Sequence, residues 1–261
     1  MNNLFSLDNK VAIVTGGAGY LGSAMTEALL EQGAIVYIAS RNKEKNSVLA
    51  KKLDDKHKNR VHVVEMDVTN TESVINAITY VYTSERKIDI ILNNSYSGKT
   101  GELLSGIELD WVDSFDTSIH ATYRVTKAVL PYMLKQNSGS IINIASMYGL
   151  VSPDPSIYGD SLQNSPPHYG AGKAGIVQFT KYLAGHFGSQ GIRANCIAPG
   201  PFPHPSTQEN KEFIKQLANK NPMKRIGHPE ELKGITVLLA SDASSYINGQ
   251  TISVDGGWTI W

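Results

Sequence analysis

A tyrosine and a lysine lie four residues apart, at Tyr169 and Lys173, in a stretch whose apolar residues recur with helical spacing. Residues at this spacing share one face of a helix, so the phenol and the ammonium would be neighbours. A free phenol has a pKa of about 10, too high for efficient proton exchange at neutral pH, and nearby positive charge would lower that pKa. The pair could exchange a proton with a substrate. This spacing is also common by chance on solvated helix faces. The surrounding residues must therefore show whether the pair is catalytic.

A cluster of glycines follows the first apolar run of the chain. Residues 11–15 have strand character, and the next residues are Gly16, Gly17, Ala18, Gly19, Tyr20, Leu21 and Gly22. A strand, a glycine turn and a helix start form a pyrophosphate cradle, because backbone N–H groups can approach the phosphates and a helix N-terminus favours their charge. A plain tight turn is the alternative. The position after the first strand favours a dinucleotide site.

The end of the second predicted strand indicates which dinucleotide would bind. An acid at this position would bind the ribose 2′-hydroxyl, and a base would accept a 2′-phosphate. The chain has Ser40, Arg41 and Asn42 there, with no carboxylate. A guanidinium can pair a phosphate bidentately, so NADP is favoured over NAD. The alternative is that Arg41 only stacks beside the adenine.

Short β-branched runs alternate with longer helical patterns along the whole chain, which is typical of a parallel sheet with crossover helices. The strands are nearly all apolar, as expected when helices cover both faces. We therefore predict one α/β domain over residues 1–261, a Rossmann-type, doubly wound, seven-stranded parallel sheet flanked by helices on both faces. The expected strands are residues 11–15, 35–39, 61–65, 88–92, 140–145, 193–197 and 250–254. The expected helices are residues 20–32, 43–56, 71–85, 108–135, 169–189 and 229–240.

Two proline-rich stretches interrupt this alternation. Both follow strands, so both should overhang the carboxyl edge of the sheet, where ligands bind in open α/β folds. Residues 152–168 are expected to form a lid or substrate wall that presents Tyr158, Asp160 and Asn164, with a passive surface excursion as the alternative. Residues 199–221 are expected to form a substrate loop.

Composition limits the possible partners and the compartment. The chain has 24 Lys plus Arg against 24 Asp plus Glu and no long block of like charge, which argues against nucleic acid or an anionic membrane as a partner. No apolar run approaches the roughly 18 residues of a spanning helix. The single Cys196 excludes an internal disulfide framework, and residues 1–10 lack a signal-peptide pattern. We expect a soluble, cytoplasmic protein.

These motifs together resemble the short-chain dehydrogenase/reductase family, in its single-domain form. Its first loop has Thr15, Gly16 and Gly22 in place, and its serine segment resembles residues 142–149, where Ser146 ends a predicted strand. The resemblance continues through residues 222–232 and 254–258. It implies hydride exchange between a nicotinamide and a carbonyl or alcohol carbon. Tyr169 would then transfer the proton, Ser146 would hydrogen-bond the same oxygen, and Lys173 would hold the ribose and tune the phenol, aided by the positive nicotinamide.

The resemblance also implies the remaining site residues. The cofactor would contact Gly16, Gly19, Tyr20, Leu21, Gly22, Ser40, Arg41, Asn42, Asp67, Val68, Asn93, Ser95, Tyr169, Lys173, Pro199, Gly200 and Phe202. The substrate would meet Tyr96, Tyr148, Tyr158, His168 and His204. Isolated histidines are more often structural, and no metal-ligand spacing links these.

The chain departs from the family pattern at four places. Tyr20 stands where the family has its middle glycine, and His204 stands where it has a threonine. Ser118 replaces the helical asparagine that holds a relay water, although a serine can still bind water. The fourth departure is the long spacing of 22 residues between Ser146 and Tyr169. Tyr158 fits the usual spacing better, but the residue four positions after it is a leucine, so Tyr169 keeps the catalytic role.

The polar character of residues 152–168 favours a sugar-like substrate over a steroid or fatty acyl chain. The displaced loop glycine and the Gly-Pro-Phe-Pro turn at residues 200–203 resemble the branch linked to bacterial surface-sugar or flagellin modification. The family implies a homotetramer, with a homodimer next, built on helices such as the one with Gly170, Gly172 and Gly175. The competing function is a nucleotide-binding scaffold or sensor that kept the fold and lost turnover.

Overall fold

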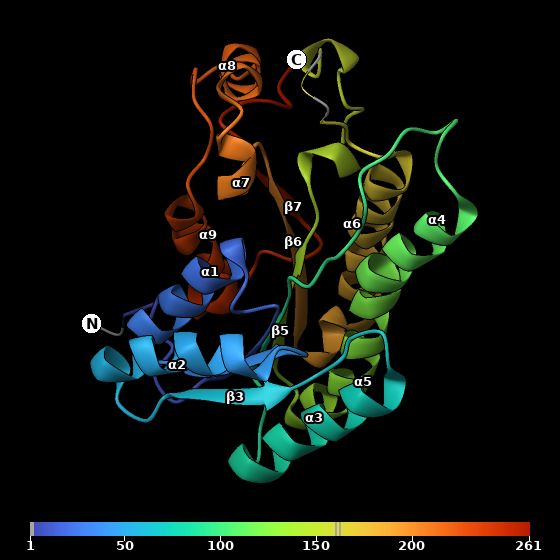
Figure 1. The fold of residues 1–261 in the computed structure, drawn as a ribbon. Helices are drawn as coiled ribbons and strands as arrows, with labels where there is room; N and C mark the ends of the chain where they lie inside the picture. The colour runs from blue at the N-terminus through green and yellow to red at the C-terminus, as the bar shows by residue number, and fades with distance from the viewer. Residues whose placement is uncertain (1–2, 160, 162) are drawn as a thin grey trace.

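A computed structural model describes residues 3–159, 161 and 163–261 (Figure 1). Asp160, expected to face the substrate, lies outside these residues. The seven strands form one sheet in the order β3-β2-β1-β4-β5-β6-β7, and every neighbouring pair is parallel. The strands are β1 (Val11–Thr15), β2 (Ile35–Ser40), β3 (Val61–Glu65), β4 (Ile90–Asn93), β5 (Gly139–Ile144), β6 (Ile192–Pro199) and β7 (Thr251–Val254). The predicted doubly wound parallel sheet is confirmed.

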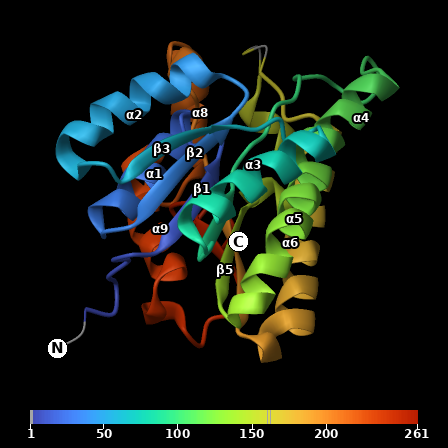
Figure 2. The same cartoon turned by 90° about the horizontal axis from the view of Figure 1, so that it is seen from below.

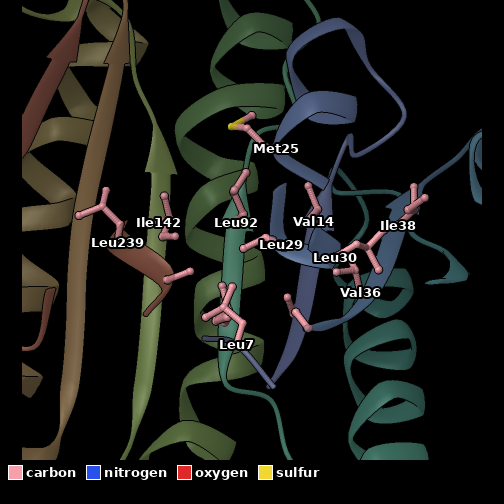
Figure 3. Packing of buried hydrophobic residues seen from close by; sticks show 14 of the residues in the cluster. Leu7, Val14, Met25, Leu29, Leu30, Val36, Ile38, Leu92, Ile142 and Leu239 are labelled. Atoms are coloured by element: carbon pink, nitrogen blue, oxygen red, sulfur yellow. The ribbon is translucent and has the colours of Figure 1, made fainter. Parts of the chain in front are cut away.

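Helices cover the sheet on both faces, as Figure 2 shows. One face carries α1 (Tyr20–Glu31), α2 (Lys43–His57) and α9 (Lys233–Ala240), and its core includes Leu29, Leu30 and Leu239 (Figure 3). The other face carries α3 (Thr71–Glu85), α5 (Ala121–Gln136) and α6 (Pro167–Phe187), with a second core that includes Val129 and Met133. Because the strands face a helix layer on each side, β1 and β4 are buried along their whole length.

The helix expected over residues 108–135 is divided by a π-helical turn. It consists of α4 (Glu108–Phe115), η1 (Asp116–His120) and α5. Two hydroxyls in this region donate to backbone carbonyls one turn earlier: Ser118 Oγ to Ser114 O at 2.6 Å and Thr122 Oγ1 to Ser118 O at 2.9 Å. Such side-chain bonds compete with the regular helical ladder and accompany local changes of helix geometry.

Residues 199–221 are not a plain loop, because they contain α7 (Pro205–Gln208) and α8 (Lys211–Lys220). Asn210 caps α8 by accepting a hydrogen bond from Phe213 N at 3.0 Å. Phe213 and Leu217 share one face of α8 and are buried against Ile157 and Trp258. The four prolines at the start of this stretch indicate a loop, but the apolar spacing after them is that of a short amphipathic helix, α8.

Short turns complete the chain: η2 (Met147–Gly149), η3 (Pro155–Ile157), η4 (Gly188–Gln190), η5 (Pro229–Leu232) and η6 (Asp242–Ser244). The helix expected to begin at Tyr169 begins at Pro167, since proline fits the first helical position, where its missing N–H costs nothing. Within the described part of the chain, no helix combines the length and apolarity needed to cross a membrane.

Candidate active site

A cleft of about 690 Å³ lies at the carboxyl edge of the sheet. Strand order reverses between β1 and β4, and open α/β folds bind ligands beside such a reversal. Most of the predicted site residues line this cleft: Gly16, Gly19, Tyr20, Leu21, Gly22, Ser40, Arg41, Asn42, Asp67, Val68, Ser95, Tyr96, Ser146, Tyr169, Lys173, Pro199, Gly200, Phe202 and His204. Side chains from six strand ends therefore meet in one place.

The glycine turn has the shape that a pyrophosphate requires. Gly16 has a φ of +63°, and a Cβ on Gly22 would lie 2.2 Å from the carbonyl oxygen of Gly16, so a side chain at Gly22 would fill the turn. Asn94 Nδ2 donates to the carbonyl oxygens of Thr15 and Gly16, both at 3.1 Å. The turn is thus held to the end of β4, and it opens onto the N-terminus of α1, which suits a dinucleotide phosphate.

The three catalytic candidates come from two elements that pack closely. Ser146 follows β5 and is 6% exposed, while Tyr169 and Lys173 lie on α6. A Cβ on Gly170 would lie 2.8 Å from the carbonyl oxygen of Tyr148, so a glycine there lets α6 approach the turn that follows Ser146. Part of the glycine content of this helix, which the family resemblance assigned to subunit contacts, therefore serves packing within the chain.

Burial controls the protonation of the tyrosine and lysine pair. Lys173 is 3% exposed, and burial lowers its pKa to about 8, while its Nζ donates to Ile144 O at 2.8 Å. Burial raises the pKa of Tyr169 to about 12, against the opposing effect of the Ser146 hydroxyl. The expected lowering of the phenol pKa is therefore not produced by the ammonium, which lies 5.7 Å from the Tyr169 ring centroid. It would need the additional positive charge of an oxidised nicotinamide.

The Tyr96 ring lies against both Tyr169 and Lys173. Its ring meets that of Tyr169 edge to face at a centroid distance of 5.0 Å, and Lys173 Nζ lies 5.3 Å from its centroid. Its hydroxyl lies 3.3 Å from Ser114 Oγ. This aromatic ring excludes water from one side of the pair and helps to hold both side chains in place.

Three of the predicted residues line neither the cleft nor the smaller cavity beside it. Asn93 Nδ2 donates to Asn143 Oδ1 at 2.8 Å, because strand side chains alternate between faces and this one points into the helix layer. Ser118 is 1% exposed, and its hydroxyl is used by the π-helical turn. His168 precedes Tyr169 by one residue, so it points to another side of α6, where it packs against Trp111 in a separate cavity of about 260 Å³.

Several residues that the sequence interpretation missed also line the cleft, among them Lys45, Asn94 and Thr117. Lys45 lies in the first turn of α2, whose N-cap Asn42 accepts a hydrogen bond from its backbone N at 2.8 Å. A basic residue three positions after the cap could have signalled this. Side-chain alternation along β4 could likewise have selected Asn94 in place of its neighbour Asn93.

A second cavity, of about 350 Å³, adjoins the cleft and shares Tyr96, Ser146 and Tyr169 with it. Its outer wall comes from the inserted residues 152–168, with Tyr158, Gln163, Asn164 and Ser165, and from Tyr148. Tyr158 Oη donates to Tyr148 Oη at 3.3 Å, and the Tyr158 ring stacks on Phe213 of α8 at 5.9 Å. The insertion and α8 thus support each other beside the catalytic candidates.

Comparisons with known proteins show the family of the chain. A family model described as enoyl-(acyl carrier protein) reductase matches residues 17–259. The 3-oxoacyl-[acyl-carrier-protein] reductase FabG of Chlamydia trachomatis is 37% identical over 254 residues, which are 96% of this chain and 98% of that protein.

Solved structures are similar over nearly the whole chain. The crystal structure of gox2181 has a TM-score of 0.92 and 35% identity and covers 98% of both chains. The gluconate 5-dehydrogenase of Burkholderia cenocepacia, solved with NADP and tartrate, has a TM-score of 0.90 and 30% identity, and covers 99% of this chain and 98% of its own. With its phosphate cradle and its serine, tyrosine and lysine at one corner, the chain belongs to the short-chain dehydrogenase/reductase family and is an NAD(P)-dependent oxidoreductase.

Proposed function

We propose that the protein uses NADP to interconvert a ketone and a secondary alcohol on a small, polar, hydroxylated molecule. The observation that carries this proposal is the polar wall of the cavity beside Tyr169, where Tyr148, Tyr158, Asn164 and Ser165 present hydroxyls and an amide. A bound nicotinamide supplies or accepts the hydride. The protein positions the substrate oxygen between Ser146 and Tyr169, and the phenol gives or takes the proton.

Support for NADP comes from the adenosine end of the cleft. Arg41 and Lys45 both line it there, beside the N-terminus of α2. Two cations near a helix N-terminus suit a 2′-phosphate. The acid that lines this end, Asp67, comes from the loop after β3, and although burial raises its pKa, hydrogen bonds from Thr69 bring that pKa below its ordinary value.

Removing the guanidinium should reverse the cofactor preference. In Arg41→Ala we expect the KM for NADPH to rise about 10- to 100-fold, because charge-assisted hydrogen bonds to the phosphate are lost, while the KM for NADH changes little. Lys43→Ala, an exposed cation two residues away, is the matched control. Steady-state kinetics with both cofactors make the measurement, and equal use of NADH and NADPH by the wild type would contradict the NADP assignment.

The substrate proposal rests on two hydroxyls of this cavity that can still form hydrogen bonds. Ser165 Oγ is buried and has no hydrogen-bond partner among them. Tyr158 donates to Tyr148, so the Tyr148 proton is available to an acceptor on the substrate. A molecule with several hydroxyls could satisfy these groups, whereas a purely apolar chain would leave them buried and unpaired.

A panel of sugars, polyols, hydroxy acids and ketones, followed by cofactor absorbance, should find the best turnover among polyhydroxylated compounds. For the best of them, Tyr158→Phe should raise KM about 2- to 10-fold and leave kcat unchanged, since the neutral hydrogen bond that orients the Tyr148 hydroxyl is lost away from the reacting carbon. Tyr246→Phe, which changes a fully exposed tyrosine, is the control. An unchanged KM in Tyr158→Phe would contradict the proposed contact.

A 3-oxoacyl thioester is the second candidate substrate, favoured by the similarity to the Chlamydia trachomatis reductase. Met147, Phe213 and Leu217 give the same cavity some apolar lining. The panel therefore includes a short 3-oxoacyl thioester, and a clear preference for it would replace the polyhydroxylated substrate. Tight NADPH binding without turnover of any compound would instead favour a nucleotide-binding scaffold.

We also propose a homotetramer. Its support is a set of exposed apolar side chains on the α4, α5 and α6 side of the molecule: Leu109, Val112, Tyr123 and Tyr182. Such a group of side chains is unusual on a free surface and would be covered by another copy of the chain. Light scattering after size-exclusion chromatography measures the assembly, and a monomer at micromolar concentration would contradict it.

A further inference from the structure

Two loops that are far apart in the sequence meet at the cleft. Tyr20 begins α1, immediately after the phosphate cradle, and its Oη accepts a hydrogen bond from Gln208 Nε2 at 3.2 Å, across 188 positions of sequence. The Tyr20 ring also meets the His204 ring edge to face, with centroids 5.5 Å apart and planes at 68°. Figure 1 shows the orange α7 close to the blue α1.

The segment that carries Gln208 and His204 is itself tied together. Gln208 Nε2 donates to Pro203 O at 2.9 Å as well as to Tyr20, so one amide links the last residue of α7 both to the residue two positions before that helix and to the phosphate loop. The backbone N–H of Thr207 donates to His204 O at 2.8 Å. Residues 203–208 therefore form a compact unit.

The contact lies along the path of the dinucleotide. Tyr20 and His204 both line the cleft, with Arg41 at the adenosine end and Tyr169 at the nicotinamide end. We propose that Tyr20, His204 and Gln208 form a clasp that closes over the bound dinucleotide and slows its release. Tyr20 acts here by holding residues 203–208 in place, and it takes no part in proton transfer.

The clasp also accounts for two departures from the family pattern at once. Tyr20 occupies the position of the family's middle glycine, and His204 occupies that of its threonine. The two replacements contact each other, whereas a glycine could offer neither the ring nor the hydroxyl. A neutral hydrogen bond and an edge-to-face ring pair together change an equilibrium constant by about 10- to 100-fold. The clasp concerns the dinucleotide alone and does not depend on which substrate is reduced.

Stopped-flow displacement of NADPH, followed by its fluorescence, tests the clasp without turnover. We expect the dissociation rate constant to rise about 3- to 10-fold in Tyr20→Phe and in Gln208→Ala, and about 10- to 100-fold in Tyr20→Gly, which removes both contacts. The double variant Tyr20→Phe/Gln208→Ala should release NADPH no faster than Gln208→Ala alone, since Gln208→Ala already removes the hydrogen bond that Tyr20→Phe removes.

Matched controls are Tyr246→Phe and Gln216→Ala, which change an exposed tyrosine and an amide on α8 away from the cleft. Both should release NADPH at the wild-type rate. Thermal unfolding of the proteins without cofactor reports whether a variant is merely less stable. Wild-type release rates in Tyr20→Phe and Gln208→Ala, or effects that multiply in the double variant, would overturn the clasp, and these two variants decide the question even if Tyr20→Gly does not fold.

Discussion

Replacing Tyr169 by phenylalanine is expected to lower kcat/KM by about three powers of ten. The change removes only the phenolic oxygen, and a positioned acid or base contributes about 10²- to 10⁴-fold to such a reaction. NADPH binding should be nearly unchanged, because the ring remains against Tyr96 at the cleft. Steady-state kinetics on the best substrate of the panel, with NADPH fluorescence titration beside them, separate the two effects.

Tyr158→Phe is the matched control for this change. Tyr158 lines the same cavity and fits the family's usual spacing from Ser146, but its hydroxyl donates to Tyr148 and its ring stacks on α8. It should keep kcat. Retained turnover in Tyr169→Phe, or loss of kcat in Tyr158→Phe in its place, would show that the wrong tyrosine has been assigned.

Replacing Lys173 by methionine is expected to lower kcat about 100-fold and to raise the KM for NADPH. The variant keeps the length of the side chain and removes the buried ammonium that donates to Ile144 O. The pH dependence of kcat/KM shows whether the Lys173 ammonium is the group responsible. Because burial lowers the Lys173 pKa to about 8, the ammonium is present below that pH and is lost as the pH rises through it. The kcat/KM of reduction by the wild type should therefore fall above about pH 8.

Lys173→Met should lack this inflection, and Lys173→Arg, which stays charged, should move it out of the measured range. Folding stability changes with pH in the opposite direction to kcat/KM. Between about pH 8 and 10.5 the unfolded chain binds more protons at Lys173 than the folded protein does, so this group makes the protein more stable as pH rises. An identical pH profile in wild type and Lys173→Met would refute the role assigned to the ammonium.

Much of the site could be predicted because the chemistry restricts residue type and spacing together. The phosphate loop needs its glycines directly after a strand, and Tyr169 needs its lysine one helical turn later, so both were found from local patterns. The choice of Tyr169 over Tyr158 followed from the missing lysine after Tyr158. The fold was predictable for the same kind of reason, since apolar strands alternating with helices allow few arrangements.

The residues that were misplaced depend on side-chain direction, which spacing alone does not fix. Asn93 and Asn94 are neighbours, yet only Asn94 reaches the cleft, because successive strand residues point to opposite faces. Ser118 lies in a π-helical turn, which the spacing of apolar residues in the sequence does not predict. The prolines before α8 are typical of a loop and favour that interpretation, although Phe213 and Leu217 have helical spacing.

A small, separate apolar core lies beside the cavity next to Tyr169. Met147, Ile157, Phe213, Leu217 and Trp258 pack together apart from the two large cores that flank the sheet. Local opening of this cluster would expose far less apolar surface than opening of the sheet, so it belongs to the less stable part of the molecule. Mutations can accumulate there without disturbing the dinucleotide half. Selection can therefore change what the enzyme accepts while the machinery of hydride transfer stays the same.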